Sequence, residues 1–170
     1  MFERSSGILL HPTSLPGKYG IGSLGKEAYK FVDFLKKANQ KLWQIFPLGP
    51  TGYGDSPYQC FSAFAGNPYL IDLENLVDLG LLTNEDIKVC YDEDNNYVDY
   101  GKLYNVKNPL LEKAYEKSSL VLDEFNRFKE ENASWLNNYT LFISIKNHFN
   151  GASWDTWDND IKFREEKAIE

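Results

Sequence analysis

A carboxylate, a hydroxyl and an aromatic ring, those of Asp55, Ser56 and Tyr58, stand close together in the stretch 47–68. The stretch is rich in glycine and proline, which fix an irregular backbone that a hydrophobic core does not require. A rigid loop that carries aromatic rings and small polar groups is typical of a sugar-binding site. These residue types therefore predict a binding loop for a carbohydrate.

Two of these side chains, and one histidine, also have structural interpretations. Asp55 lies in a Gly-Asp-Ser-Pro turn, where an aspartate commonly accepts backbone N–H groups, and we favour that role for it. Ser56 could bind a sugar hydroxyl or stabilise the turn, and the sequence leaves both open. His11 is interpreted as a hydrogen-bonded structural residue, because His148 lies far along the chain and nothing else completes a triad or metal site.

The elements that position the loop come from the apolar pattern. Residues 7–11 form an apolar run without alternation, which predicts a fully buried strand. Residues 23–38 have apolar side chains at helical spacing, and 41–46 predict a second strand. Strand, helix and strand make a βαβ unit with parallel strands. Ligands of parallel α/β folds bind beyond the carboxyl ends of the strands, where the loops 12–22 and 47–68 begin.

The remainder of the chain predicts mainly helices. Short helices are expected at 73–82 and, started by Asn108 and Pro109, at 108–117. A longer helical region is expected over 121–149. The expected connections are a capping box at Thr83 to Asp86, a polar turn at 92–96, a stop at Asn150-Gly151, a loop at 153–157 and the start of a helix at 163–170.

Aromatic residues of the longer helical region fall on one face. Their spacings of four and three predict a packed core stripe, which consists of Trp135, Tyr139, Phe142, Ile145 and Phe149. Trp154 and Trp157 could line a groove, and covering the core of this region is the interpretation that we favour.

Bulk composition limits the partners and the compartment. The net charge of −7 argues against nucleic acid and anionic membranes, which basic surfaces bind. Cys60 and Cys90 form no disulfide framework and are expected to be reduced thiols of a cytoplasmic protein. The apolar run 8–10 is too short for a signal peptide, and no apolar stretch has membrane-spanning length.

The predicted sheet is incomplete. One βαβ unit followed by helices leaves strand edges unpaired, and a (β/α)8 barrel takes about 250 residues. We therefore expect the 170 residues to be a piece of something longer.

Several segments resemble the 4-α-glucanotransferases, also called amylomaltases or disproportionating enzymes, of glycoside hydrolase family 77. The matching segments cover essentially the whole chain in order: 7–17, 47–68, 69–73, 98–101, 135–142, the pair Trp154 and Trp157, and 164–168. The resemblance implies an α/β fold, an incomplete (β/α)8 TIM barrel with a mainly helical inserted subdomain. It assigns 1–59 to the first βαβ unit, 60–152 to the insertion and 153–170 to a loop and the start of a further helix.

The resemblance also implies an activity. Such enzymes transfer segments of α-1,4-glucans to glucose or another glucan by retaining double displacement, with two carboxyl groups about 5 Å apart. They use no metal and no organic cofactor, and their partners are malto-oligosaccharides, starch or glycogen-type glucans. The aspartate nucleophile lies in an Arg-x-Asp-His segment, which this sequence does not contain, and the glutamate acid/base lies later still.

Site residues follow from the same resemblance. Tyr58 is expected to stack under the glucose at the cleavage subsite, with Ser56 and Asp55 beside it as substrate-binding candidates. Tyr53 and Tyr100 resemble two tyrosines that hold glucan at a secondary site away from catalysis. The alternatives are ordinary packing or exposure of these tyrosines.

Two other functions remain open at this point: a non-catalytic α-glucan-binding module, and a truncated product without function. Because the carboxylates are expected downstream, the 170 residues alone are expected not to disproportionate maltotriose. Because the sheet is incomplete, we also expect poor solubility or molten behaviour of the isolated chain.

Overall fold

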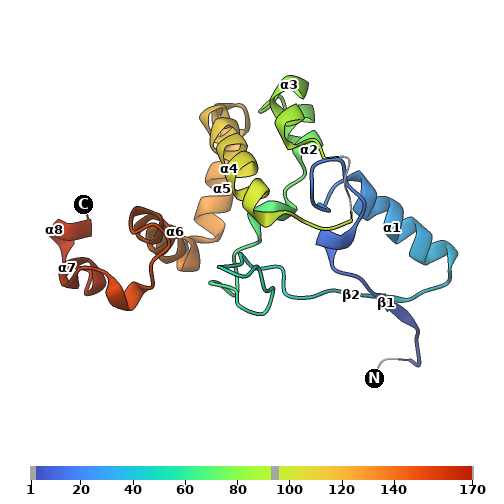
Figure 1. Ribbon diagram of the computed structural model, residues 1–170, viewed down its shortest axis with the longest axis horizontal. Helices are drawn as coiled ribbons and strands as arrows, with labels where there is room; N and C mark the ends of the chain where they lie inside the picture. The colour runs from blue at the N-terminus through green and yellow to red at the C-terminus, as the bar shows by residue number, and fades with distance from the viewer. Residues whose placement is uncertain (1–2, 93–95, 170) are drawn as a thin grey trace. The chain divides into compact units, whose positions relative to one another are not determined.

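Two short parallel strands joined through a helix open the chain. The computed structural model describes residues 3–92 and 96–169 (Figure 1). Strand β1 (Gly7–Leu9) pairs in parallel with β2 (Leu42–Gln44), with Ile8 opposite Trp43, and helix α1 (Lys26–Lys37) connects them. The predicted βαβ unit is confirmed, with strands shorter than expected.

Helix α1 is held to the strands and to the segment that follows the loop. The ring of Phe31 packs edge-on against Trp43, with ring centroids 4.9 Å apart. Gly25 precedes the helix, and a Cβ there would collide with the carboxylate of Asp72. The same carboxylate accepts a hydrogen bond of 2.6 Å from the Ser23 hydroxyl. The start of α1 therefore requires glycine for close approach.

The prediction of a fully buried strand at 7–11 is wrong for this chain. Residues of both strands are exposed, including Ile8 at 39%, Leu9 at 52% and Leu42 at 51%. The described residues contain only these two strands, so neither face of the pair is covered by a complete sheet or helix layer. Apolar composition indicated burial, but burial depends on the elements that are present.

Helices follow the loop. They are α2 (Leu73–Asp78), α3 (Asn84–Ile87), α4 (Tyr100–Glu116), α5 (Leu122–Glu131), α6 (Ala133–His148), α7 (Asn159–Lys162) and α8 (Glu166–Ile169). Short 3-10 turns lie at Pro12–Ser14, Pro68–Leu70, Lys88–Cys90, Ser118–Val121 and Trp154–Thr156. The predicted loop at 153–157 thus contains one helical turn. Residues 93–95 of the expected polar turn 92–96 lie outside the described residues.

The helices α2 to α4 enclose a small apolar core. Its buried members are Leu73, Leu81, Leu82, Ile87, Cys90, Leu110 and Ala114. The predicted capping box is confirmed at α3, where Thr83 accepts the backbone N–H of Asp86 and Asp86 accepts that of Thr83. This cap fixes the turn that brings α3 back onto the core.

Loss of the cap should be measurable. The variant Thr83→Ala is expected to lower the free energy of unfolding by about 1 kcal/mol, because the N–H of Asp86 loses its partner. Urea unfolding followed by circular dichroism measures this change. Thr140→Ala, at an exposed position within α6, is the matched control, and an equal loss there would contradict a capping role.

The expected helix start at Asn108-Pro109 is wrong. Helix α4 begins nine residues earlier, where the Asp99 carboxylate accepts the N–H of Lys102 at 2.9 Å, and Pro109 lies inside the helix. A proline there removes one backbone hydrogen bond and costs about 3 kcal/mol. Burial of the face that carries Leu103 and Leu110 offsets this cost.

The helical region 121–149 is not continuous. It is divided at Asn132 into α5 and α6, and α6 ends at the Asn150-Gly151 pair, whose φ angles of 51° and 80° are left-handed. The aromatic stripe of α6 is half-buried rather than core. Trp157 is the buried residue here, and its ring packs at 5.7 Å from Phe142 and 5.9 Å from Phe149. Trp154 is 58% exposed.

The last part of the chain differs from its prediction in the position of its helices. Helix α7 ends at Lys162, with Phe163 as its C-cap, and α8 begins only at Glu166, because Arg164 adopts a left-handed φ of 57° between them. The described residues form two compact units, Met1–Phe125 and Asn126–Glu170. The boundaries expected at 59/60 and 152/153 are not tested by this division and stay predictions.

Candidate functional site

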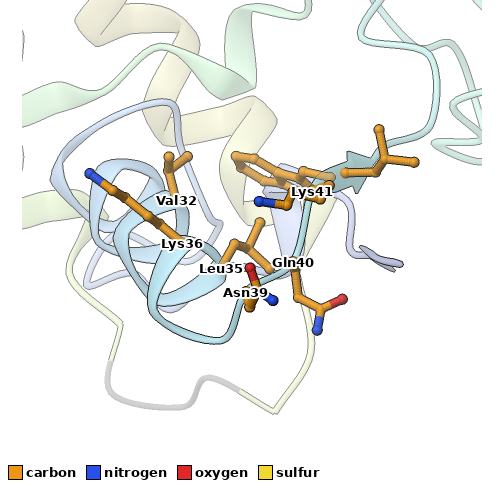
Figure 2. A pocket seen from close by; sticks show the side chains of 8 residues that line it. Val32, Leu35, Lys36, Asn39, Gln40 and Lys41 are labelled. Atoms are coloured by element: carbon orange, nitrogen blue, oxygen red, sulfur yellow. The ribbon is translucent and has the colours of Figure 1, made fainter. Parts of the chain in front are cut away.

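A cavity of about 240 Å³ lies between α1 and β2 (Figure 2). Val32, Leu35 and Lys36 reach it from the helix, and Asn39, Gln40 and Lys41 from the connection to the strand. It adjoins the amino end of β2, opposite to the end at which parallel α/β folds bind ligands. It also lacks acidic side chains, and we do not assign it as the site.

A second cavity, of about 170 Å³, lies beyond the carboxyl ends of both strands. Its lining comes from the loops after β1 and β2 and from the start of α4: His11, Thr13, Ser14, Phe46, Thr51, Asp55, Pro57, Asn67 and Tyr100. The sequence pattern predicts ligand binding at this end, and the cavity is there. All of its residues belong to the unit Met1–Phe125.

The loop 47–68 is folded back on itself. Thr51 and Cys60 form an isolated antiparallel bridge, and the N–H of Asn67 donates to the carbonyl of Leu48 at 2.7 Å. The buried Asn67 side chain accepts the N–H of Tyr69 at 2.9 Å. The loop is therefore pinned at both ends, which holds its tip in one conformation.

An aromatic row runs along one side of the cavity. The rings of His11 and Phe46 are stacked, with centroids 5.5 Å apart and an interplanar angle of 26°. Phe46 in turn contacts Tyr58, with centroids 5.6 Å apart. Tyr58 is 72% exposed, so its ring is supported from one side and open to solvent on the other. An apolar ring face of this kind can bind the C–H face of a sugar.

The backbone-capping contacts that we favoured for Asp55 are not formed among the described residues. Its carboxylate accepts no backbone N–H among the described residues and lines the cavity instead. Burial raises the pKa of this carboxyl above its ordinary value, and the nearby Thr51 hydroxyl partly opposes that shift. The Thr51 hydroxyl itself is buried and lies outside hydrogen-bond geometry with the carboxylate. The left-handed φ of 53° at Asp55 is a conformation that aspartate tolerates.

Tyr100 lines the cavity, and Tyr69 lies beside it. Tyr100, the first residue of α4, lies against Tyr69, with ring centroids 6.0 Å apart. Burial and the negative charge of Asp55 raise the pKa of both hydroxyls, and the Thr13 side chain partly offsets this at Tyr100. Asp55 and the two tyrosines thus share one polar environment.

Tyr53, Ser56 and Tyr58 are not part of the cavity lining. Tyr53 projects fully into solvent, whereas Tyr100 is half-buried and lines the cavity, so the two expected secondary-site residues have unlike surroundings. The Ser56 hydroxyl accepts the N–H of Tyr58 at 3.4 Å, which agrees with the turn-stabilising alternative.

Lys107 is a residue that the sequence reasoning missed. Its side chain is 1% exposed, and its ammonium donates to the carbonyls of Tyr69 and Ile71 at 2.7 and 2.8 Å. It ties the middle of α4 to the segment behind Tyr69. The available signal was its position on the face of Leu103, Leu110 and Ala114, where a lysine is out of place.

Neither a metal centre nor a membrane helix emerges from the described part of the chain. Residues 3–92 and 96–169 hold no group of three or more His, Cys, Asp or Glu side chains that could bind a metal ion. Within the same residues, no helix combines the length and the apolar character that crossing a bilayer requires.

Known proteins similar to this chain share one description. A model of the 4-alpha-glucanotransferase family matches residues 10–170. The 4-alpha-glucanotransferase of Streptococcus pneumoniae is 49% identical over all of this chain and 34% of its own length, and that of Thermus thermophilus is 51% identical over 98% and 33%. The solved amylomaltase of Streptococcus agalactiae, in complex with acarbose, superposes with a TM-score of 0.91 at 43% identity, over 98% of this chain and 34% of that one.

These matches show to which family the chain belongs and how much of its relatives' length it covers. The chain spans about a third of the length of the curated relatives that it matches. The resemblance found in the sequence is confirmed: the chain belongs to the 4-alpha-glucanotransferase family, glycoside hydrolase family 77.

Proposed function

We propose that the chain forms the glucan-binding face of a 4-α-glucanotransferase built on a (β/α)8 barrel. The observation that carries the proposal is the cavity of about 170 Å³ at the carboxyl ends of β1 and β2, in a member of this family. An aromatic row, several hydroxyl groups and one carboxylate border it, which is the chemistry that a sugar ring needs.

In this proposal, each loop residue has a defined task. Tyr58 supports the ring of the glucose at the cleavage subsite, and Asp55 binds sugar hydroxyls beside it. Ser56 holds the backbone turn that carries Tyr58. Tyr53, which is fully exposed, contacts a distal part of the glucan, and Tyr100 joins α4 to the binding cavity.

The reaction is a retaining double displacement in which segments of an α-1,4-glucan pass to glucose or another glucan. The aspartate nucleophile and the glutamate acid/base come from sequence outside these 170 residues, and no metal or organic cofactor takes part. A cytoplasmic location is part of the proposal, and it is supported by the two free cysteines.

Maltotriose tests the proposal directly. The complete polypeptide that carries these residues should convert it to glucose and longer malto-oligosaccharides, resolved by chromatography, and EDTA should leave the rate unchanged. Cellotriose, which has β-1,4 bonds, is the matched control and should remain intact.

The possible outcomes separate the candidate functions. Binding of maltotriose without products would replace the enzyme with a non-catalytic glucan-binding module. Neither binding nor products would overturn the proposal altogether.

A further inference from the structure

His11 is a cavity residue to which neither the loop motif nor the resemblance assigns a function. It follows β1, lines the cavity of about 170 Å³, and stacks on Phe46. Its Nδ1 atom is buried and has no hydrogen-bond partner among the described residues. A purely structural histidine at this depth would have one, because an unpaired buried polar atom is costly.

A second unpartnered atom lines the same cavity. The Thr51 Oγ1 is also buried without a completed hydrogen bond in the described part of the chain. These two are the only side-chain atoms of this kind found there, and they come from different loops. Their convergence on one cavity, beside the Asp55 carboxylate, indicates a group that belongs between them.

The size and polarity of the cavity define that group. A volume of about 170 Å³ exceeds what a single water needs. Burial lowers the pKa of His11, so the imidazole is neutral at pH 7, with one nitrogen that donates and one that accepts. A sugar hydroxyl both donates and accepts, and it therefore satisfies Nδ1 in either tautomer, as well as the hydroxyl of Thr51.

We infer that His11 and Thr51 form a hydrogen-bonding subsite for the hydroxyls of one glucose residue, whose ring is covered by the aromatic row of Phe46 and Tyr58. This rests on the proposed glucan-binding function. It makes His11 a specificity-determining residue, since it recognises hydroxyl positions that the aromatic faces do not distinguish.

Calorimetric titration of the complete polypeptide with maltotriose tests the inference. His11→Phe keeps a flat ring against Phe46 and removes both nitrogens, and we expect binding to weaken by roughly 3- to 10-fold. Thr51→Val removes only the hydroxyl and should have an effect of similar size. His11→Asn, whose amide reaches the position of Nδ1, should restore part of the affinity.

Imidazole NMR gives a readout that a merely structural histidine would not move. On addition of maltotriose, the Nδ1 resonance of His11 should shift, whereas that of His148 on α6 should not. His148→Phe is the matched control and should bind maltotriose as tightly as the unaltered polypeptide.

The outcomes distinguish the inference from the proposed function. Undiminished affinity in both His11→Phe and Thr51→Val, with folding confirmed by circular dichroism, would mean a water-filled structural cavity and overturn the inference alone. Absence of maltotriose binding by the unaltered polypeptide would overturn the proposed function, and the inference with it.

Discussion

Lys107 should add to the free energy of unfolding as the pH rises from about 8 to 10, and Lys107→Met should lack this contribution. Burial lowers the pKa of Lys107 from 10.5 to about 8. Between these values the unfolded chain binds the proton and the folded chain does not, so raising the pH favours folding, by about 2–3 kcal/mol at pH 10. Below pH 8 the lysine is protonated in both states, and the difference disappears.

Urea unfolding at pH 7 and pH 10 measures this effect as a difference between variants. Methionine keeps the apolar stem but leaves the carbonyls of Tyr69 and Ile71 without their donor, so the variant should also be less stable at pH 10. Lys36→Met, at an exposed position of α1, is the control and should retain the contribution of Lys107. If the free energy of unfolding of Lys107→Met changed with pH as that of the unaltered protein does, a group other than Lys107 would be responsible for the change.

Removal of the Tyr58 ring should abolish most of the proposed transfer activity. Tyr58→Ala in the complete polypeptide is expected to lower turnover of maltotriose more than tenfold, which corresponds to about 1.4 kcal/mol of lost transition-state stabilisation. The ring is 72% exposed and contacts Phe46, so its loss should change the free energy of unfolding little. Initial rates of glucose release and a thermal melt measure the two quantities separately.

Two tyrosine variants give this experiment its controls. Tyr58→Phe keeps the ring and should retain most of the rate, because the support comes from the aromatic face. Tyr53→Ala removes a tyrosine that is fully exposed and should change the length of the products more than the rate. Unaltered turnover in Tyr58→Ala would remove Tyr58 from the site.

Local patterns predicted much of the fold and the end of the strands at which the candidate cavity lies. The βαβ unit, the Thr83 cap and the stop at Gly151 each depend on a few neighbouring residues, and the structure contains all three. The cavity beyond the strands was also predictable, because the direction of a parallel strand determines where its loop leaves.

Properties that depend on distant contacts could not be read in this way. The start of α4 at Asp99 competes with the stronger-looking signal at Pro109, and only burial of one helix face against the core decides between them. The exposure of β1 and the place of Asp55 in the cavity lining likewise depend on which elements surround them. The unpartnered Nδ1 of His11 could not be predicted either, because a sequence does not show which atoms lie within hydrogen-bond distance of one another.

The two cysteines differ in burial, so their reaction with thiol reagents reports on two different parts of the molecule. Cys60 is half-buried within the loop 47–68, and its thiol donates to the carbonyl of Pro57 at 2.8 Å. Cys90 is 1% exposed, and burial raises the pKa of its thiol, which keeps it in the unreactive protonated form. Alkylating reagents should therefore modify Cys60 well before Cys90, and Cys90 should react only when the core around it opens.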